Sequence, residues 1–506
     1  MNMGRKSGIL LHPTSICGKY GIGDLGPEAY HFIDFLYNSG QKLWQVLPLN
    51  PPGYGESPYQ CYSAFAGNIM LISPDLLFED GLLEKTDIAD IPDFAPDRVE
   101  FEKVKKFKMN LLKKAYDNFK KSGNTGFSGD FSLFCRDKTW WLEDYALFMS
   151  FKNLFGGSDW NEWEKDIARR ERTAMDKKAV SIRDEVEAQK FWQYIFFRQW
   201  LKLKGYCREK GIGIIGDIPI FVSHDSADVW AHPEFFRLDA EGYPLVVAGV
   251  PPDYFSTTGQ LWGNPIYNWE KMKAGNYQWW IDRFKNLFEL VDMVRLDHFR
   301  GFEAYWEVSA DEETAVNGRW VKGPGEDFFS VLQTALGEAP VIAENLGFIT
   351  REVEVLRAKF GFPGMAILQF AFGRDSHEST FRPHKFERNL VAYTGTHDNN
   401  TVAGWWGGGK HDSTRSMKEV KEERKNAGAY LNTDGTDVNW AFIRALMVSV
   451  ANFVIFPLQD VLGLGSEARM NTPSTSRGNW AWRYRKDMLK DKYGKKLKDF
   501  CAIYGR

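Results

Sequence analysis

Carboxylates stand at the ends of short apolar runs in this chain. Asp297 closes the run VDMVRL, with Arg295 two positions before it, and Glu344 follows the run PVIA. Residues two positions apart on a strand point to the same side, so Arg295 would favour the charged form of Asp297. Burial would instead favour the protonated form of Glu344. A purely structural ion pair at the end of a strand stays open from this stretch alone.

Further polar groups end other apolar runs: Asp217 follows IIG, and His397 and Asp398 follow LVAYTGT. Neither a cysteine or serine nucleophile with a partner base nor a metal-ligand spacing is evident, so we expect no bound metal and no cofactor. Paired carboxylates are typical of glycosidic-bond chemistry, in which one attacks the anomeric carbon and the other protonates the leaving oxygen. We predict Asp297 as the nucleophile and Glu344 as the acid, with Asp398 and His397 holding sugar hydroxyls. Carboxylates about 5 Å apart would retain the anomeric configuration, and a wider gap would invert it.

Two segments rich in Gly, Pro or polar residues display aromatic rings, at residues 50–68 and 253–269. The rings include Tyr54 and Tyr59 in the first segment, and Tyr254, Phe255 and Trp262 in the second. Rings on loops over strand ends suit sugar binding, because the apolar face of a pyranose packs on an aromatic ring. A structural loop that buries its own rings is the alternative for residues 50–68. We expect the second loop to cover the cleft.

Eight short apolar runs can position these groups. They begin near residues 8, 43, 212, 291, 340, 365, 390 and 453. Helical segments separate most of them, which predicts an α/β protein with a closed (β/α)8 barrel, a TIM barrel whose strands end at one rim. A doubly wound open sheet is the alternative. We expect residues 1–506 to form one catalytic unit, with a helical insertion at 70–190 between strands two and three and an active-site loop insertion at 224–277 between strands three and four.

Composition limits the classes of partner. The net charge of -3 gives no support for a nucleic-acid partner, and the lysine-rich stretch 103–114 is typical of a solvated helix face. Five dispersed cysteines favour a reducing compartment, and no apolar stretch reaches the roughly 18 residues of a membrane span. We therefore expect a cytoplasmic protein without a membrane partner. The loop Gly21–Gly26 formally matches a dinucleotide fingerprint, but the acidic residue expected about 20 positions later is absent.

Several motifs together carry a resemblance to one family. They run from SGILLHPTS to NWAWR near residue 483, and include GYGESPYQ, GDIPIFV, PPDYFSTTGQLWGNPIYNW, VRLDHFRG, AENLG, GTHDNNT and MNTPSTSRGNW. On these motifs the chain resembles the 4-alpha-glucanotransferases, also called amylomaltases or disproportionating enzymes, family 77 of the glycoside hydrolases. The resemblance implies transfer of a segment of a (1→4)-alpha-D-glucan to the 4-hydroxyl of an acceptor sugar.

The resemblance also implies roles for single residues. The family's nucleophile falls on Asp297, its acid/base on Glu344 and its transition-state stabiliser on Asp398. The companions in the motifs are Asp217, Arg295 and His397. Contacts to glucosyl units are implied for Tyr59, Gln260, Trp262 and Asn471, and a secondary glucan site for Tyr54. The implied partners are maltooligosaccharides, amylose and starch- or glycogen-derived glucans, with glucose or a glucan as acceptor.

Other functions would leave different signatures. An α-amylase-like retaining hydrolase shares the barrel and the three carboxylates but releases sugars mainly to water. A glucan-binding protein without activity would not need Asp297, Glu344 and Asp398 together. A nicotinamide oxidoreductase rests only on the Gly21–Gly26 loop. Incubation with maltotriose separates a glucanotransferase from an α-amylase-like hydrolase, because only transfer produces a ladder of longer oligomers together with glucose.

Overall fold

The computed structural model describes residues 4–122, 125–252, 256–373, 379–408, 416–475 and 477–506. Its centre is an eight-stranded sheet in the order β10-β11-β12-β1-β2-β3-β6-β9. The strands are β1 (Lys6–Leu10), β2 (Leu43–Gln45), β3 (Gly213–Ile218), β6 (Met293–Leu296), β9 (Val341–Ala343), β10 (Gly364–Ile367), β11 (Leu390–Tyr393) and β12 (Phe453–Pro457). All eight predicted strands are present, and the predicted (β/α)8 barrel is confirmed.

The barrel strands are parallel and almost wholly buried, as the unbroken apolar runs predicted. The two ends of the sheet meet at β9 and β10. There the Ala343 N–H donates to the Pro363 carbonyl at 2.9 Å, and the Met365 N–H donates to the Asn345 side chain at 2.7 Å. The residue directly after Glu344 therefore closes the barrel, which fixes the position of that carboxylate.

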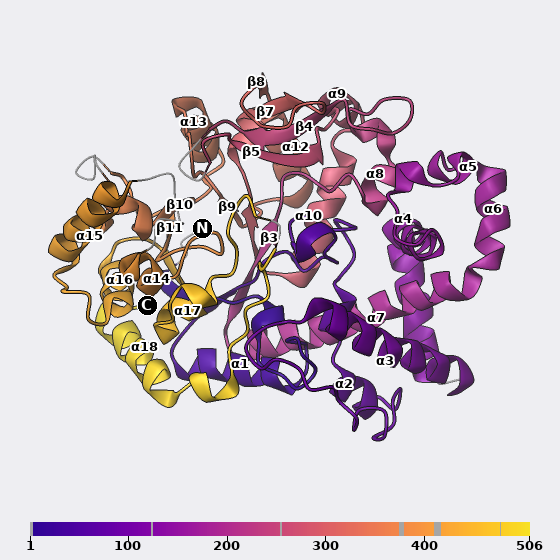
Figure 1. The fold of residues 1–506 in the computed structure, drawn as a ribbon, viewed down its shortest axis with the longest axis horizontal. Coiled ribbons are helices and arrows are strands. Elements are labelled where there is room, and N and C mark those ends of the chain that lie inside the picture. Colours follow the sequence, from indigo (N-terminus) through magenta and orange to yellow (C-terminus); the bar gives the residue numbers. More distant parts are fainter. Residues whose placement is uncertain (1–3, 123–124, 253–255, 374–378, 409–415, 476) are drawn as a thin grey trace.

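Helices surround the sheet (Figure 1). Those that connect barrel strands or close the chain include α1 (Pro27–Asn38), α7 (Arg183–Glu209), α10 (Gln278–Leu290), α12 (Gly325–Leu336), α13 (Arg351–Lys359), α14 (Val402–Gly407), α15 (Met417–Leu431), α16 (Val438–Val448), α17 (Leu458–Leu462) and α18 (Asp491–Tyr504). Shorter helices are α8 (Ala227–Ala231), α9 (Trp269–Ala274) and α11 (Arg300–Glu303). None of the helices in the described ranges is long and apolar enough to cross a membrane.

The connection between β2 and β3 is mostly helical. It contains α2 (Pro74–Glu79), α3 (Phe101–Ser122), α4 (Thr125–Leu154), α5 (Lys165–Ala168) and α6 (Arg172–Ser181), and returns along α7 (Figure 1). The stretch 103–114 is not wholly a solvated face, because Lys108 is buried. Its ammonium donates to the Met70 carbonyl at 2.7 Å and faces Asp24 at 3.7 Å, while burial lowers the pKa of Lys108 to about 8.

A second sheet, in the order β5-β4-β7-β8, was not predicted from the sequence. It is antiparallel and contains β4 (Val246–Val250), β5 (Gln260–Pro265), β7 (Ala304–Ser309) and β8 (Gly318–Lys322). Figure 1 shows it beyond one end of the barrel, near α9 and α12. Its strands come from both sides of β6, and the pairing of β4 with β7 joins the two sequence-local pairs β4–β5 and β7–β8. Part of the segment predicted as a loop at 224–277 is therefore sheet.

The glycine-rich loop at residues 21–26 has a packing role. A Cβ on Gly23 would lie 1.9 Å from the Pro13 carbonyl oxygen, so the close approach of two backbone segments requires glycine there. The loop leads into α1, whose first residue is Pro27, and Asp24 accepts the Gly26 N–H at 2.9 Å. This close approach explains Gly23 without a bound nucleotide.

Candidate active site

The carboxyl ends of the barrel strands surround a cavity of about 1150 Å³. Sequence-predicted residues that line it are Tyr54, Tyr59, Gln260, Trp262, Arg295, Asp297, Glu344, His397, Asp398 and Asn471. Asp217 does not line the cavity but lies buried beside Arg295. Tyr254 and Phe255 fall outside the described residues. Segments hundreds of residues apart are thus brought to one rim, as expected for this fold.

Arg295 connects two carboxylates at the floor of the site. Its Nη1 donates to both oxygens of Asp217, at 2.9 and 2.7 Å, and its Nη2 lies 2.7 Å from Oδ1 of Asp297. Burial raises the pKa of Asp217 to about 6 against the pull of Arg295, so Asp217 remains ionised at neutral pH. The same two aspartates hold the pKa of Arg295 well above its usual range. Arg295 is therefore a permanent cation that orients Asp297 toward the cavity.

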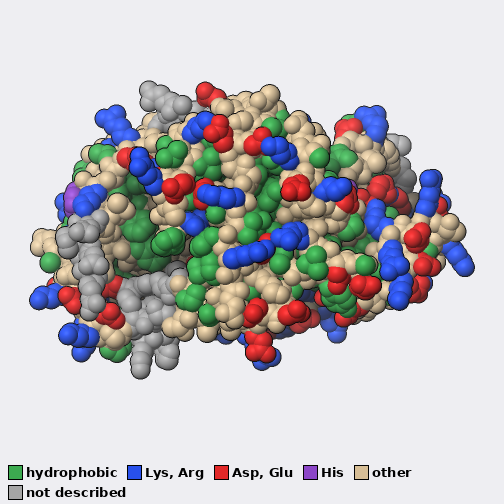
Figure 2. All heavy atoms as spheres, turned by 90° about the horizontal axis from the view of Figure 1, so that it is seen from above, with side chains coloured by type: hydrophobic (Ala, Val, Ile, Leu, Met, Phe, Trp, Pro, Cys, Tyr) green, Lys and Arg blue, Asp and Glu red, His purple; other side chains and the backbone are tan. Residues whose placement is uncertain are grey.

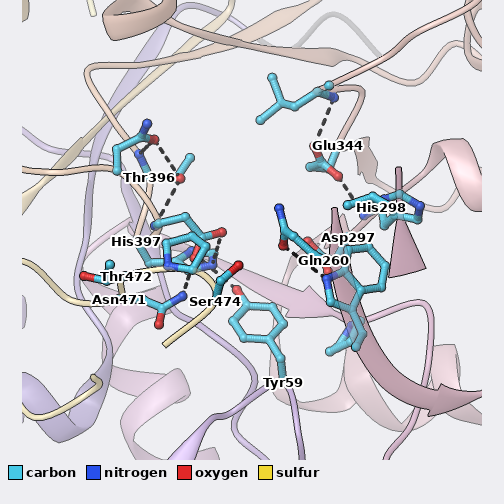
Figure 3. Close-up of a pocket in the computed structure, with 18 of the residues that line it drawn as sticks. Tyr59, Gln260, Asp297, His298, Glu344, Thr396, His397, Asn471, Thr472 and Ser474 are labelled. Atoms are coloured by element: carbon cyan, nitrogen blue, oxygen red, sulfur yellow. Dashed lines mark hydrogen bonds and ion pairs between the residues drawn. The ribbon is translucent and has the colours of Figure 1, made fainter. Parts of the chain in front are cut away.

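Glu344 is held by two backbone donors at the end of β9. The His298 N–H donates to Oε2 at 2.8 Å, and the Leu346 N–H donates to Oε1 at 3.0 Å (Figure 3). Burial raises the pKa of Glu344 to about 7, with a further contribution from Asp297, while Arg295 and the two N–H groups oppose the rise. A carboxyl group with this pKa can both give and accept a proton near neutral pH.

His298, the residue after Asp297, has a left-handed backbone conformation with φ +50. Such a φ is uncommon for a residue other than glycine. In this conformation the His298 N–H donates to Glu344. The peptide unit that joins Asp297 to His298 therefore links the predicted nucleophile to the predicted acid. The His298 ring packs edge-on to Trp262 with centroids 4.8 Å apart. His298 lies in the motif VRLDHFRG, but the sequence indicated no role for it.

Asp398 follows β11 and His397, and Figure 3 shows His397 and Asn471 across the cavity from Glu344 and His298. The Asn471 side chain donates to Oδ1 at 2.6 Å, and Nε2 of His397 lies 3.3 Å from Oδ2. Burial alone would raise the pKa of Asp398, but the charge and hydrogen bond of His397 and the Asn471 donor lower it to about 2. Asp398 is therefore negative throughout the physiological pH range.

Tyr59 joins the two walls of the site. Its hydroxyl donates to Oδ2 of Asp217 at 2.9 Å, and its ring stacks on the His397 ring with centroids 4.9 Å apart. Trp480 packs against both rings, at 5.8 and 5.7 Å. The segment of residues 50–68 thus places at least one ring against catalytic groups, whereas Tyr54, on a 3-10 turn of the same segment, is exposed at the edge of the cavity.

The wall formed by β5 carries an amide network. Nε1 of Trp262 donates to Oε1 of Gln260 at 3.2 Å, and Nε2 of Gln60 donates to the Trp262 carbonyl at 3.2 Å and to Asn264 at 3.0 Å. Sequence reasoning found Gln260 and Trp262 but missed Gln60 and Asn264. Gln60 lies in the motif GYGESPYQ and Asn264 in the motif PPDYFSTTGQLWGNPIYNW, but only the fold shows that the two segments touch.

The arrangement supplies an oriented carboxylate, a carboxyl group with a pKa near neutrality and a third, permanently charged carboxylate around one cavity. These are the groups that glycosidic-bond cleavage requires. Among the described residues, no group of three or more His, Cys, Asp or Glu side chains is placed to hold a metal ion.

Comparison with known proteins identifies the family. The family model described as 4-alpha-glucanotransferase, for family 77 of the glycoside hydrolases, matches residues 11–489. The chain belongs to this family. The 4-alpha-glucanotransferase of Synechocystis is 48% identical over 505 residues, which cover 99% of this chain and 98% of the relative. That of Thermus thermophilus is 48% identical over 500 residues, covering 98% of each chain.

A solved structure of a 4-alpha-glucanotransferase-type enzyme agrees with the fold. The amylomaltase from Streptococcus agalactiae in complex with acarbose is 40% identical, has a TM-score of 0.93 and matches over 99% of both chains. Amylomaltase from Corynebacterium glutamicum, at 16% identity and a TM-score of 0.81, shares the fold. The resemblance drawn from the sequence motifs is confirmed, and with it the 4-alpha-glucanotransferase activity of the chain.

Arg295→Met tests the charge arrangement at the floor of the site. The substitution leaves Asp217 buried without its cation, so we expect the free energy of unfolding to fall by about 3–5 kcal/mol at pH 8. The loss should shrink as the pH falls from 8 toward 6, because Asp217 without Arg295 has a pKa above the value of about 6 that it has beside Arg295, and its protonation in the folded variant removes the uncompensated charge. Urea unfolding at several pH values measures both effects.

Lys19→Met is the matched control for this prediction. Lys19 forms a 2.8 Å ion pair with Asp75 but its side chain is 52% exposed, so the expected change is below about 1 kcal/mol. An Arg295→Met variant that unfolds like this control at every pH would contradict the role given to Arg295.

Proposed function

We propose that this 4-alpha-glucanotransferase disproportionates maltooligosaccharides and starch- or glycogen-derived glucans by retaining double displacement through a covalent glucosyl–Asp297 intermediate. The observation that carries this mechanism is that one short segment, residues 295–298, holds both carboxyl groups. Arg295 holds Asp297 at 2.7 Å, and the next peptide N–H, that of His298, holds Glu344 at 2.8 Å. This proximity supports a nucleophile and an acid that act on one bond without a water between them.

In the first step, Oδ of Asp297 attacks the anomeric carbon of the donor glucan. The glycosidic C–O bond breaks, and Glu344 gives its proton to the leaving oxygen, so the reducing-end part of the donor departs as an alcohol. Asp398 stays ionised, with a pKa of about 2, and offsets the positive charge that develops on the sugar ring. His397 and Asn471, which orient Asp398, also face the sugar hydroxyls in this proposal.

In the second step, ionised Glu344 accepts the proton of the acceptor's 4-hydroxyl. The acceptor oxygen then attacks the anomeric carbon, the bond to Asp297 breaks, and the aspartate regains its charge. Two displacements at one carbon restore the original configuration. Glucose or a second glucan serves as the acceptor, and Tyr59, Gln260 and Trp262 contact the glucosyl units on either side of the reacting bond.

Transfer wins over hydrolysis when an acceptor binds well and water is kept out. We propose that the segment 253–269, which includes Tyr254 and Phe255, covers the intermediate and is anchored through Trp262 of β5. Tyr54 is proposed for a secondary glucan contact, since its exposed ring lies at the edge of the cavity.

Residues 70–190 and 224–277 are proposed as insertions in a single catalytic unit of residues 1–506.

Incubation with maltotriose tests the proposed reaction. We expect glucose together with a ladder of longer oligomers, and Asp297→Asn should lower kcat by roughly 10⁴-fold or more because a neutral amide cannot form the ester. Products no longer than maltotriose would favour an α-amylase-like hydrolase. A variant with near-normal transfer would remove Asp297 from the role of nucleophile.

The pH profile tests the role of Glu344. The acid must be protonated in the free enzyme, so kcat/KM for maltotriose should fall about tenfold for each pH unit above the pKa, which lies at about 7. No acidic limb from Asp398 is expected above pH 4, because its pKa is about 2. Initial rates from pH 5 to 9 measure the profile. A flat profile through pH 8 would assign the proton to another group.

A further inference from the structure

An aromatic patch borders the catalytic cavity beyond Glu344. Trp320 of β8 and Phe348, which follows β9, both line the cavity and are 36% and 70% exposed. The Arg300 guanidinium lies against both rings, 3.7 Å from the Trp320 centroid and 5.5 Å from the Phe348 centroid. Its Nη1 also donates to the Phe348 carbonyl at 2.7 Å. These three residues are called the Arg300 patch.

The rings of the patch are held in place by the protein. Arg300 is buried and so acts as a fixed clamp between the loop after β9 and the second sheet. Trp306 packs edge-on to Trp320 with centroids 5.1 Å apart, and its Nε1 is fixed by the Ala315 carbonyl at 2.8 Å. A ring that is already ordered loses little conformational freedom when a ligand packs on it. The patch is therefore suited to binding.

The patch lies on the acid side of the catalytic centre. The two backbone donors to Glu344 come from His298 and Leu346. Arg300 follows the first donor by two residues and Phe348 follows the second by two residues. The acid must face the oxygen that links the transferred sugar to the leaving or incoming glucan. A glucan that continues past Glu344 would therefore run along the segments that carry the patch.

The chemistry of the patch fits a neutral, amphipathic chain. A pyranose presents an apolar face to an aromatic ring and hydroxyls at its edge, which suit the two rings and the guanidinium. Figure 2 views the molecule from the side of β7 and β8, where hydrophobic side chains reach the surface between interspersed Lys, Arg, Asp and Glu. Because neither sign of charge dominates that face, a polyanionic or polycationic ligand is not favoured.

We propose that the Arg300 patch is a binding site for the acceptor glucan. The patch contacts glucose units of the acceptor beyond the unit that receives the transferred segment. The proposal rests on the proposed function, since it takes Glu344 as the acid/base. Through this contact the enzyme selects acceptors of several glucose units over glucose. Trp320 and Phe348 determine specificity and take no part in bond breaking.

The two half-reactions can be separated with α-maltotriosyl fluoride as donor, because fluoride leaves without occupying acceptor sites. Fluoride release measures glycosylation, and added glucose or maltopentaose measures transfer to a short or a long acceptor. In Trp320→Ala and Phe348→Ala, kcat/KM for maltopentaose should fall about fivefold or more for each lost ring contact. The values for glucose and for fluoride release should stay within twofold of the unsubstituted enzyme.

Two further variants complete the experiment. Tyr243→Ala removes a ring that is 50% exposed but does not line the cavity, and should change neither acceptor. Phe348→Trp keeps an aromatic surface and should restore use of maltopentaose. Equal losses with glucose and maltopentaose, or no loss with either, would overturn the patch as an acceptor site. If the unsubstituted enzyme releases fluoride but transfers to neither acceptor, the proposed function itself fails.

Discussion

A buried cation between two buried or half-buried carboxylates is the constraint on which the active site depends. Arg295 sits among Asp217, Asp297 and Tyr59 at the point where β3 and β6 lie side by side. A buried carboxylate without a partner is strongly destabilising. Removing one member of a buried ion pair therefore lowers the free energy of unfolding by more than the intact pair contributes to it. Asp217 is therefore best understood as the counter-ion that keeps Arg295 in place. Arg295 in turn holds Asp297 at 2.7 Å, where it faces the cavity.

The acid is positioned by backbone groups. The left-handed conformation of His298 turns its N–H toward Glu344, while Asn345, the next residue, closes the barrel against Met365. Nucleophile and acid thus belong to adjacent barrel strands that are joined to each other by main-chain contacts. Positioning by backbone rather than by long side chains limits the movement of the two groups, which suits a reaction that needs both on one bond.

Much of this could be predicted from the sequence. Eight short, mostly apolar runs predicted eight strands buried on both faces, and the polar residues that follow several of them predicted one catalytic rim. Strands of the second sheet escaped prediction because they are short and because the sheet is completed by the pairing of β4 with β7, which lie on opposite sides of β6 in the chain. Lys108 escaped because the partners that permit its burial, Met70 and Asp24, come from other segments. The sequence also could not show that Asp217 lies behind Arg295 and not in the cavity.

The functional site likewise has features that the sequence indicates and features that only the fold shows. Residue types at strand ends indicated the chemistry, and the motifs indicated the family. Contacts between segments decide what the motifs cannot show: the amide network of Gln60 and Asn264, the stack of Tyr59 on His397, and the clamp of Arg300 on two exposed rings. In this account the barrel supplies bond cleavage, whereas the second sheet and the loop after β9 determine which acceptor is used.

The covalent intermediate on Asp297 is the central claim, and trapping it is the most direct test. Glu344→Gln removes the acid/base, but α-maltotriosyl fluoride needs no acid to leave, so the first displacement should proceed and the second should stall. Mass spectrometry of the quenched and digested variant should find a maltotriosyl group on the peptide that contains Asp297. Attachment to another carboxylate, or rapid fluoride release with no attached sugar, would contradict the account.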